Sequence, residues 1–318
     1  MNNISVVPEF LLVGFAGPWK LQVFQGGIFM VIYLAALMGN GLIIIITSLD
    51  PCLHKPMYFF LRNLSFFDLC LISAVVPKTI VNSLMHSNSI SFLGCVAQVF
   101  LVAFSAATGL FLLTAMSIDR YIAICHPLHY DVIMNRVTCF QMASLSWLSG
   151  GMISVIHTAG TFSLSYCGLN EIRQFFCDIP QLLAISHSKH VTVEIVLILI
   201  TLVLDFCCLI CIIISYTYIF SIVRTIQSSE GQSKAYSTCI PHLIVFVLFL
   251  STAFGAYLKP ILGSASFTDT ILSAFYIVLP PSLNPIIYGL RNKAMKVGLQ
   301  KLITKKLLTK GSLIFLQE

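Results

Sequence analysis

Long apolar stretches separated by short polar ones are the dominant pattern along the chain. A helix needs about 20 apolar residues to cross the hydrocarbon core of a bilayer, and seven stretches meet that length. Backbone groups inside a bilayer must be hydrogen-bonded within the segment, which favours helices. The pattern predicts an all-α membrane protein, a seven-transmembrane helix bundle with spans at roughly residues 24–48, 57–83, 94–119, 139–161, 194–223, 236–258 and 269–290.

Composition and charge agree with this class. Hydrophobic residues make up 58% of the chain and charged ones 9%, against about 25% charged in soluble proteins. The net charge of +6 does not indicate nucleic acid as a partner, because the basic residues form no patch interleaved with exposed aromatic ones. Of the 18 Lys and Arg residues, 13 fall on the side of the C-terminus, which predicts that this side is cytoplasmic.

We therefore expect one domain over 1–318, with an extracellular N-terminus at 1–23, the helix bundle at 24–290, and a cytoplasmic helix and tail at 291–318. The first segment holds the glycosylation sequon Asn3-Ile4-Ser5. No apolar stretch followed by a cleavage site precedes the first span, so we expect no removable signal peptide. In the tail, lysines alternate with a predicted apolar helical face formed by Met295, Leu299, Leu302 and Leu307. This favours a short amphipathic helix on anionic membrane lipid; a solvated basic tail is the alternative.

Three polar residues lie at similar depths inside predicted spans: Asn40, Asp68 and Asn284. Polar groups are costly in a membrane and need partners. Pro285 follows Asn284 and removes a helix hydrogen bond, so a polar neighbour or water must satisfy the freed carbonyl. We expect one hydrated polar cluster that links three helices; the alternative is isolated residues that hold helix pairs together.

An acid and a base stand side by side at the end of the third span, in Asp119-Arg120-Tyr121. Such a pair can be broken and re-formed at the mouth of a bundle. Ordinary snorkelling of charges at a helix end is the alternative. The motif Asn284-Pro285-x-x-Tyr288 lies at the same end of span seven, and the coincidence favours a functional pair.

Together these motifs resemble the olfactory (odorant) receptor family, within the class A, rhodopsin-like G-protein-coupled receptors. The stretches that carry the resemblance cover about residues 10–295. They are Gly39-Asn40, PMYFFLRNLSFFDLC (56–70), MSIDRYIAICHPLHY (116–130), Ser215-Tyr216, KAYSTCIPHL (234–243) and PSLNPIIYGLRN (281–292).

The resemblance implies a receptor and not an enzyme, without a cofactor, in the plasma membrane. Its ligand would be a small volatile odorant, and its partner a heterotrimeric G protein of the stimulatory olfactory type, which raises cyclic AMP. On activation Arg120 would leave Asp119 and engage the G protein. Roles in coupling or activation are implied for Asp119, Arg120, Tyr121, Tyr216, Lys234, His242, Asn284, Pro285 and Tyr288.

An apolar ligand site is predicted where small residues of span three face larger ones of span six. Such a cavity, with few polar contacts, suits a small neutral ligand; tight helix packing is the alternative interpretation of the alanines. The candidate lining residues are Val102, Ala103, Ala106, Ala107, Leu110, Leu250, Ala253, Phe254 and Tyr257.

Asp205 in span five stands outside the family motifs. With Thr201 one turn away, it is a candidate to bind a hydroxyl or amine group of the ligand. A neutral, hydrogen-bonded Asp that serves helix packing is the alternative.

The resemblance also implies a disulfide between Cys95 and Cys177. A second loop disulfide is not expected, because His187 stands where a partner for Cys167 would lie. Gly109 is a further departure, since odorant receptors commonly have Glu there, facing Asp68.

Other functions remain as alternatives. A non-olfactory small-molecule receptor of the same class is the nearest of them. A transporter would show paired halves, a line of mid-membrane charges or broken helices, and the sequence shows none of these patterns.

Overall fold

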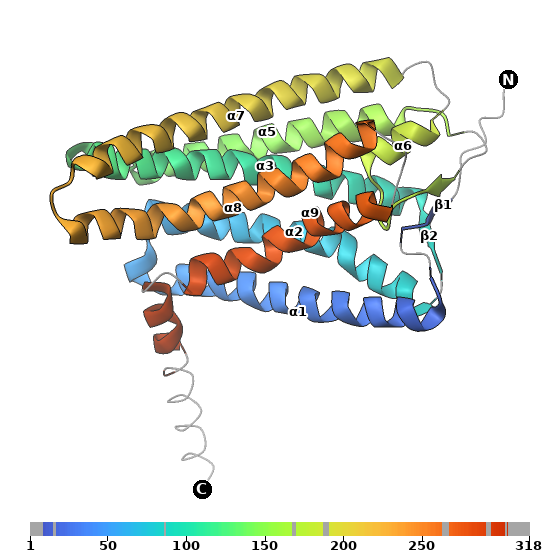
Figure 1. Ribbon diagram of the computed structural model, residues 1–318, viewed down its shortest axis with the longest axis horizontal. Helices are drawn as coiled ribbons and strands as arrows, with labels where there is room; N and C mark the ends of the chain where they lie inside the picture. Colours follow the sequence, from blue (N-terminus) through green and yellow to red (C-terminus); the bar gives the residue numbers. More distant parts are fainter. Residues whose placement is uncertain are drawn as a thin grey trace, which may run out of the picture.

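Long helices run side by side along the molecule (Figure 1). The computed structural model describes residues 9–14, 17–85, 87–166, 170–186, 191–262, 267–290, 294–302 and 304. Within these residues, seven helices are long and apolar enough to cross a membrane. They are α1 (Trp19–Leu49), α2 (Pro56–Met85), α3 (Phe92–Cys125), α5 (Arg136–Phe162), α7 (Val191–Thr225), α8 (Ser229–Leu262) and α9 (Phe267–Pro285).

The predicted fold class is confirmed. The first six predicted spans each lie on one of these helices, whereas the seventh, 269–290, covers α9 and the π-helical residues 286–290 that follow it. Several helices extend beyond the predicted ends: α3 continues to Cys125, and α8 begins at Ser229. Hydropathy marks only the part of a helix that suits hydrocarbon, whereas the helix itself continues into water until a break. For α3 the break is His126, because the residue before a proline disfavours helical geometry and Pro127 follows.

Short elements connect the long helices. A three-stranded sheet, which the sequence analysis did not predict, forms from β1 (Glu9–Leu12), β2 (Ser89–Ser91) and β3 (Glu171–Ile172). The central strand β1 pairs antiparallel with β2 and parallel with β3. The other short elements are η1 (Pro51–Leu53), η2 (Pro127–His129), α4 (Tyr130–Ile133), α6 (Ile179–Ile185), the π-helix η3 (Ile286–Leu290) and a helix at 294–302.

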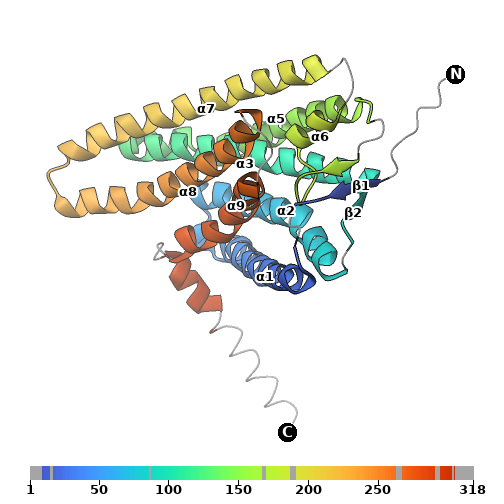
Figure 2. The ribbon, with the colours of Figure 1, turned by 45° about the vertical axis from the view of Figure 1, so that its right-hand side comes forward.

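The bundle has two distinct ends. The sheet lies at one end, here called the sheet end, and the helix 294–302 lies at the other, here called the tail end (Figures 1 and 2). The connections η1, η2 and α4 are at the tail end, whereas α6 is at the sheet end.

Helix α3 is central, because it contacts α2, α5, α7 and α8. The buried apolar side chains form three clusters: one below the sheet around Phe10 and Cys95, one around Val102 and Tyr276, and one toward the tail end around Met116. Large apolar side chains are instead exposed along the outside of α1, α5 and α7. Such surfaces suit lipid and not water, which fits a protein that crosses a membrane.

Candidate functional site

A polar cluster joins α1, α2 and α9 inside the bundle. Asn284 donates a hydrogen bond from Nδ2 to Asp68 Oδ2 at 2.7 Å. Asn40 donates from Nδ2 to the carbonyl of Pro281 at 2.8 Å. This carbonyl lies four residues before Pro285, which has no N–H to bond it, so Asn40 supplies the hydrogen bond that the proline removes. Two separate hydrogen bonds thus link α9 to the other helices, one to Asn40 of α1 and one to Asp68 of α2.

A small cavity adjoins this cluster between α2, α3, α8 and α9. Asp68, Ser105, Gly109 and Asn284 line it together with apolar side chains. About 20 Å³ is open to the centre of a water-sized sphere, and one water needs about 10–15 Å³ on this measure. Ser105 Oγ and Asn284 Oδ1 have no hydrogen-bond partner among the described residues. The cavity therefore has both the room and the polar groups to hold a water molecule.

Gly109 leaves space in the wall of this cavity. A Cβ added there would meet only Leu64, at an ordinary contact distance of 3.9 Å. The position therefore has room for a Cβ atom, so local packing does not require glycine.

The predicted pair at the tail end of α3 is formed and buried. Arg120 Nη2 lies 2.8 Å from Asp119 Oδ2, and Asp119 is fully buried. The second carboxylate oxygen, Oδ1, accepts a hydrogen bond from the hydroxyl of Tyr130 at 2.7 Å. Tyr121 is half-buried and Lys234 is exposed; no hydrogen bond to the pair is found for either within the described part of the chain.

Tyr130 is a residue that the sequence reasoning missed. It belongs to α4, in the connection between α3 and α5 and outside the membrane-spanning helices. From there it bonds the oxygen of Asp119 that Arg120 leaves free. Burial first, and the Asp119 carboxylate second, raise the pKa of this phenol well above its ordinary range. The signal available in the sequence was only that Tyr130 ends the stretch ICHPLHY, which carried the family resemblance.

A second polar link connects α7, α8 and α3. His242 Nε2 lies 3.0 Å from the carbonyl of Leu113, and Tyr216 Oη lies 2.8 Å from His242 Nδ1. A carbonyl only accepts, so Nε2 carries the proton and Nδ1 accepts the hydrogen bond from Tyr216. The hydroxyl of Tyr288 is buried without a hydrogen-bond partner among the described residues.

Tyr288 lies in the π-helix η3, which follows directly after Pro285. Short π-helical segments arise where the regular hydrogen-bond ladder of a helix is interrupted. Gly39 permits close approach of α1 here, because a Cβ added to it would lie 2.7 Å from Pro285 Cβ.

The predicted apolar ligand residues divide into two layers. Val102, Ala106 and Ala253 belong to one apolar cluster, nearer the sheet end, whereas Leu110 and Leu250 belong to the deeper one. Ala103 and Ala107 are half-buried. Phe254 was predicted on the same face as Ala253, yet it is 43% exposed, because neighbouring residues of a helix point about 100° apart. Phe254 therefore lies at the edge of this face.

The surroundings of Asp205 differ from the prediction. Thr201 was expected to face a ligand with it, but its hydroxyl donates to Leu197 O at 3.1 Å and lies 2.8 Å from His157 Nε2. Asp205 itself is half-buried. The sequence reasoning missed His157 and its second partner, Glu194, although both are titratable residues in or next to predicted spans.

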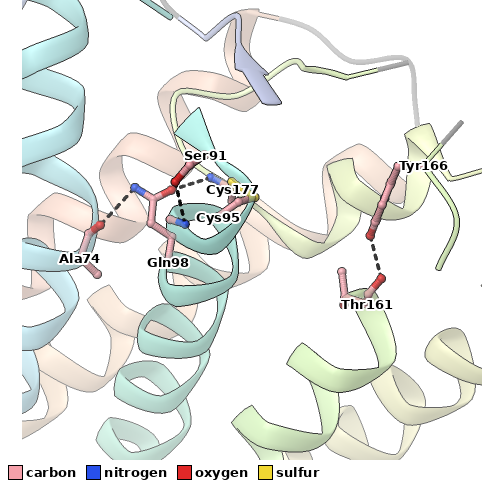
Figure 3. The surroundings of a disulfide bond; sticks show 8 residues. Ala74, Ser91, Cys95, Gln98, Thr161, Tyr166 and Cys177 are labelled. Atoms are coloured by element: carbon pink, nitrogen blue, oxygen red, sulfur yellow. Dashed lines mark hydrogen bonds between the residues drawn. A yellow bond between two sulfur atoms is a disulfide. The ribbon is translucent and has the colours of Figure 1, made fainter. Parts of the chain in front are cut away.

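The predicted disulfide between Cys95 and Cys177 is confirmed. Gln98, one turn along α3, donates to Ala74 O at 3.1 Å and accepts from the backbone N–H of Cys177 at 3.0 Å (Figure 3). Ser91 caps the start of α3 by accepting from Gly94 N at 3.2 Å. The first turns of α3 at the sheet end are thus joined both to α2 and to the long loop.

The helix 294–302 packs against the tail end of α1. Met295 is buried, and a Cβ added to Gly298 would lie 2.8 Å from Ile46 Cγ2. Lys301 Nζ lies 3.2 Å from Asp50 Oδ2. Part of the face that was predicted to lie on lipid therefore packs on the protein instead.

Five predicted positions fall outside this description. Asn3, Cys167, His187 and Leu307 lie outside the described residues, and the side chain of Tyr257 is likewise outside them.

An Asp-Arg pair buried at the tail end of the third long helix, together with an Asn-Pro-x-x-Tyr segment in the seventh, defines a class A G-protein-coupled receptor. Comparison with known proteins identifies the family. A family profile described as "Olfactory receptor" matches residues 29–306, and the chain belongs to this family.

Three human relatives match almost end to end. Olfactory receptor 14A16 is 64% identical over 310 residues, covering 98% of this chain and 100% of the relative. Olfactory receptor 14A2 is 52% identical over 305 residues, with 96% and 97% covered. Olfactory receptor 14L1 is 51% identical over 299 residues, with 94% and 92% covered.

Proposed function

We propose that this olfactory receptor binds small, mostly apolar volatile odorants in the sheet-end half of its bundle and activates a stimulatory G protein of the olfactory type, which raises cyclic AMP. Membership of the family makes the chain an odorant receptor and a G-protein-coupled receptor, which is not an enzyme. One observation carries the mechanism: the buried Asp119 carboxylate is shared between Arg120 and Tyr130 at the end of the bundle opposite the sheet.

The proposed switch is the release of Arg120. An agonist shifts a two-state bundle only if it binds one state better than the other. In the state described, Asp119 holds Arg120 and His242 holds Tyr216. In the active state Arg120 would engage the G protein, and Tyr216 and Tyr288 would hold the opened end. Tyr121, Lys234 and His242 lie on the elements that would move, and the contacts of Asn284 and Pro285 with α1 and α2 would form the pivot.

The proposed ligand site lies between α3, α7 and α8. Its apolar wall would be formed by Val102, Ala103, Ala106, Ala107, Leu110, Leu250, Ala253 and Tyr257, with Phe254 at its edge. Asp205 is the proposed polar contact for a hydroxyl or amine group of the ligand. Its half-buried carboxyl group on α7 supports that role. The hydrogen bonds of Thr201 argue that this residue supports the site and does not bind the ligand directly.

The chain is a multi-pass membrane protein, and we propose the plasma membrane with the sheet end outside and the tail end in the cytoplasm. The excess of Lys and Arg on the tail side supports this orientation. Asn3 would then be available for glycosylation. The exposed Val297 and Lys296 of the helix 294–302 would face membrane lipid.

A cyclic AMP assay tests the proposal. Cells that express the full chain are exposed to a panel of volatile compounds, and Arg120→Ala is the coupling control. We expect at least one compound to raise cyclic AMP in wild type and none to do so in Arg120→Ala at equal surface amount. A response that persists in cells without stimulatory G proteins would refute the coupling, and solute flux without any G-protein signal would favour a transporter.

A further inference from the structure

A buried polar network joins α5 to α7 at the sheet end. His157 of α5 lies between two residues of α7: its Nδ1 is 2.8 Å from Glu194 Oε1, and its Nε2 is 2.8 Å from Thr201 Oγ1. Glu194 and His157 are 1% and 6% exposed. Glu194 and Thr201 are seven residues apart, which is about two helical turns, so one imidazole bonds two successive turns of α7.

Hydrogen-bond counting allows two arrangements of the protons in this network. The Thr201 hydroxyl lies within hydrogen-bond distance of both Leu197 O and His157 Nε2. If it donates to Leu197 O, Nε2 carries a proton and donates to Thr201, and a second proton lies between Nδ1 and Glu194 Oε1. If it donates to Nε2, the imidazole is neutral and its Nδ1–H donates to the Glu194 carboxylate. His157 bonds both residues of α7 in either arrangement.

The shape of α5 is matched to the Glu194 side chain. Gly160 provides the space, because a Cβ added there would overlap the second carboxylate oxygen, Oε2. Thr161, one turn beyond His157, donates to Glu194 Oε1 at 3.4 Å, and Tyr166 donates to Thr161 O at 2.7 Å (Figure 3). Burial first, and the charge of Glu194 second, raise the pKa of Tyr166 above its ordinary range. A carboxyl group placed so closely fixes both the height and the rotation of α7.

The large apolar side chains in the described sheet-end half of α7 face outward and do little to fix the rotation of this helix. Its side chains Ile195, Val196, Leu199, Ile200 and Val203 are all between 47% and 63% exposed. Apolar contacts with lipid are non-directional, so they do not select one rotation of the helix. The directional hydrogen bonds of His157, by contrast, select one rotation of α7.

We infer that His157 and Glu194 are positioning residues for odorant binding, which hold the sheet-end half of α7 against α5 and thereby set where Asp205 stands. Asp205 lies four residues, about one helical turn, beyond Thr201 on the same face of α7. The inference rests on the proposed function, because it assumes a ligand site beside α7. Neither residue needs to touch the ligand for this role.

Two disruptive variants test the inference in the cyclic AMP assay, with the full chain and an agonist from the panel. His157→Phe keeps a ring and removes both nitrogens, and Glu194→Ala removes the carboxyl group. We expect each to raise the agonist concentration for half-maximal response by roughly tenfold or more, with the maximal response and the surface amount retained. A wild-type concentration dependence in both variants would overturn the inference.

Glu194→Gln separates hydrogen bonding from charge. Its amide N–H₂ can donate to Nδ1 of a neutral His157, while Nε2–H still donates to Thr201. We therefore expect this variant to stay within about threefold of wild type. A loss as large as that of Glu194→Ala would contradict a hydrogen-bonded positioning role.

The chain offers a matched control pair. Thr201 and Thr217 both lie on α7, and both hydroxyls lie within hydrogen-bond distance of the carbonyl four residues before them, but of the two only Thr201 also bonds His157. Thr201→Val is expected to raise the agonist concentration for half-maximal response, and Thr217→Val is expected to leave it unchanged. Equal effects of the two would count against the network.

A second measurement does not depend on a ligand. The thermal unfolding midpoint of the purified full-length receptor, without agonist, should be lower in His157→Phe and Glu194→Ala than in Thr217→Val. If wild type responds to no odorant, the proposed function fails while this measurement still decides whether the network holds α7. Midpoints equal to that of Thr217→Val in both variants would overturn the inference.

Discussion

The long loop at the sheet end and the Asp119 site at the tail end are held by different kinds of bond. The Cys95–Cys177 disulfide and the strand pairs of β1 join the long loop to the start of α3. At the tail end the links run between side chains, from Asp119 to Arg120 and Tyr130. Covalent and backbone bonds persist while helices shift, whereas side-chain hydrogen bonds can be exchanged. The difference indicates that the long loop above the proposed ligand site is rigid, whereas the Asp119 site at the tail end can switch during coupling.

Removing the disulfide is expected to have the largest effect. Cys177→Ser opens a link between residues 82 positions apart, and a loop of this length predicts a loss of about 4 kcal/mol in the free energy of unfolding. The thermal unfolding midpoint of purified receptor, followed by tryptophan fluorescence, measures it. Cys207→Ser, a free and exposed cysteine on α7, is the control. If the two variants unfold at one temperature, the contrast between the ends is wrong.

Tyr130→Phe tests the switchable end and should have an intermediate effect. It leaves one oxygen of the buried Asp119 carboxylate without its donor, which costs about 2 kcal/mol in the closed state. We expect cyclic AMP to rise in the absence of any odorant, because the closed state loses stability relative to the open one. Tyr218→Phe, at an exposed tyrosine of α7, should leave basal cyclic AMP unchanged. An unchanged basal signal in Tyr130→Phe would remove this residue from the switch.

Asp50→Asn is expected to have the smallest effect of the three, a slight weakening of the contact between the tail helix and α1. The effect is small because Lys301 is 57% exposed and water screens its ion pair with Asp50. The backbone N–H of Cys52 first, and Lys301 to a lesser extent, lower the pKa of Asp50 below its ordinary value of 3.8. Its ionised form therefore stabilises the folded contact above that value, and this contribution is lost as pH falls through the lowered folded pKa.

Backbone hydrogen exchange of residues 294–302 measures the docking of the tail helix. At neutral pH we expect faster exchange in Asp50→Asn than in wild type, and no change in Asp131→Asn, at an exposed aspartate of α4. Spin labels on the tail helix and on α2 should separate in wild type as the pH is lowered below about 3.8, with no such change in Asp50→Asn. Identical exchange in wild type and Asp50→Asn would assign the docking to Met295 and Gly298 alone.

The sequence predicted those features whose cause is local. Length and hydropathy suffice for seven helices, because a bilayer requires each segment to satisfy its own backbone. The adjacency of Asp119 and Arg120 suffices for their pairing. The missing N–H of Pro285 predicts a free carbonyl, although not that Asn40 would bond it.

Long-range features escaped prediction for a physical reason. Strands of two to four residues, such as β1 and β3, are too short to show an alternating pattern. The partners Tyr130 of Asp119 and Glu194 of His157 come from other elements, and the rotation and height of each helix decide which side chains meet. The same holds for Phe254, whose spacing matches the buried face although it lies at the edge.

By itself, the sequence determined that this protein crosses a membrane seven times, belongs with odorant receptors and carries an acid–base pair at the end of its third span. These properties follow from hydropathy, short motifs and neighbouring residues. Only the tertiary structure decided which side chains complete that pair, how α7 is fixed to α5 and where the tail helix docks. Helix packing sets those contacts, because directional hydrogen bonds form only where two helices bring donor and acceptor within about 3 Å.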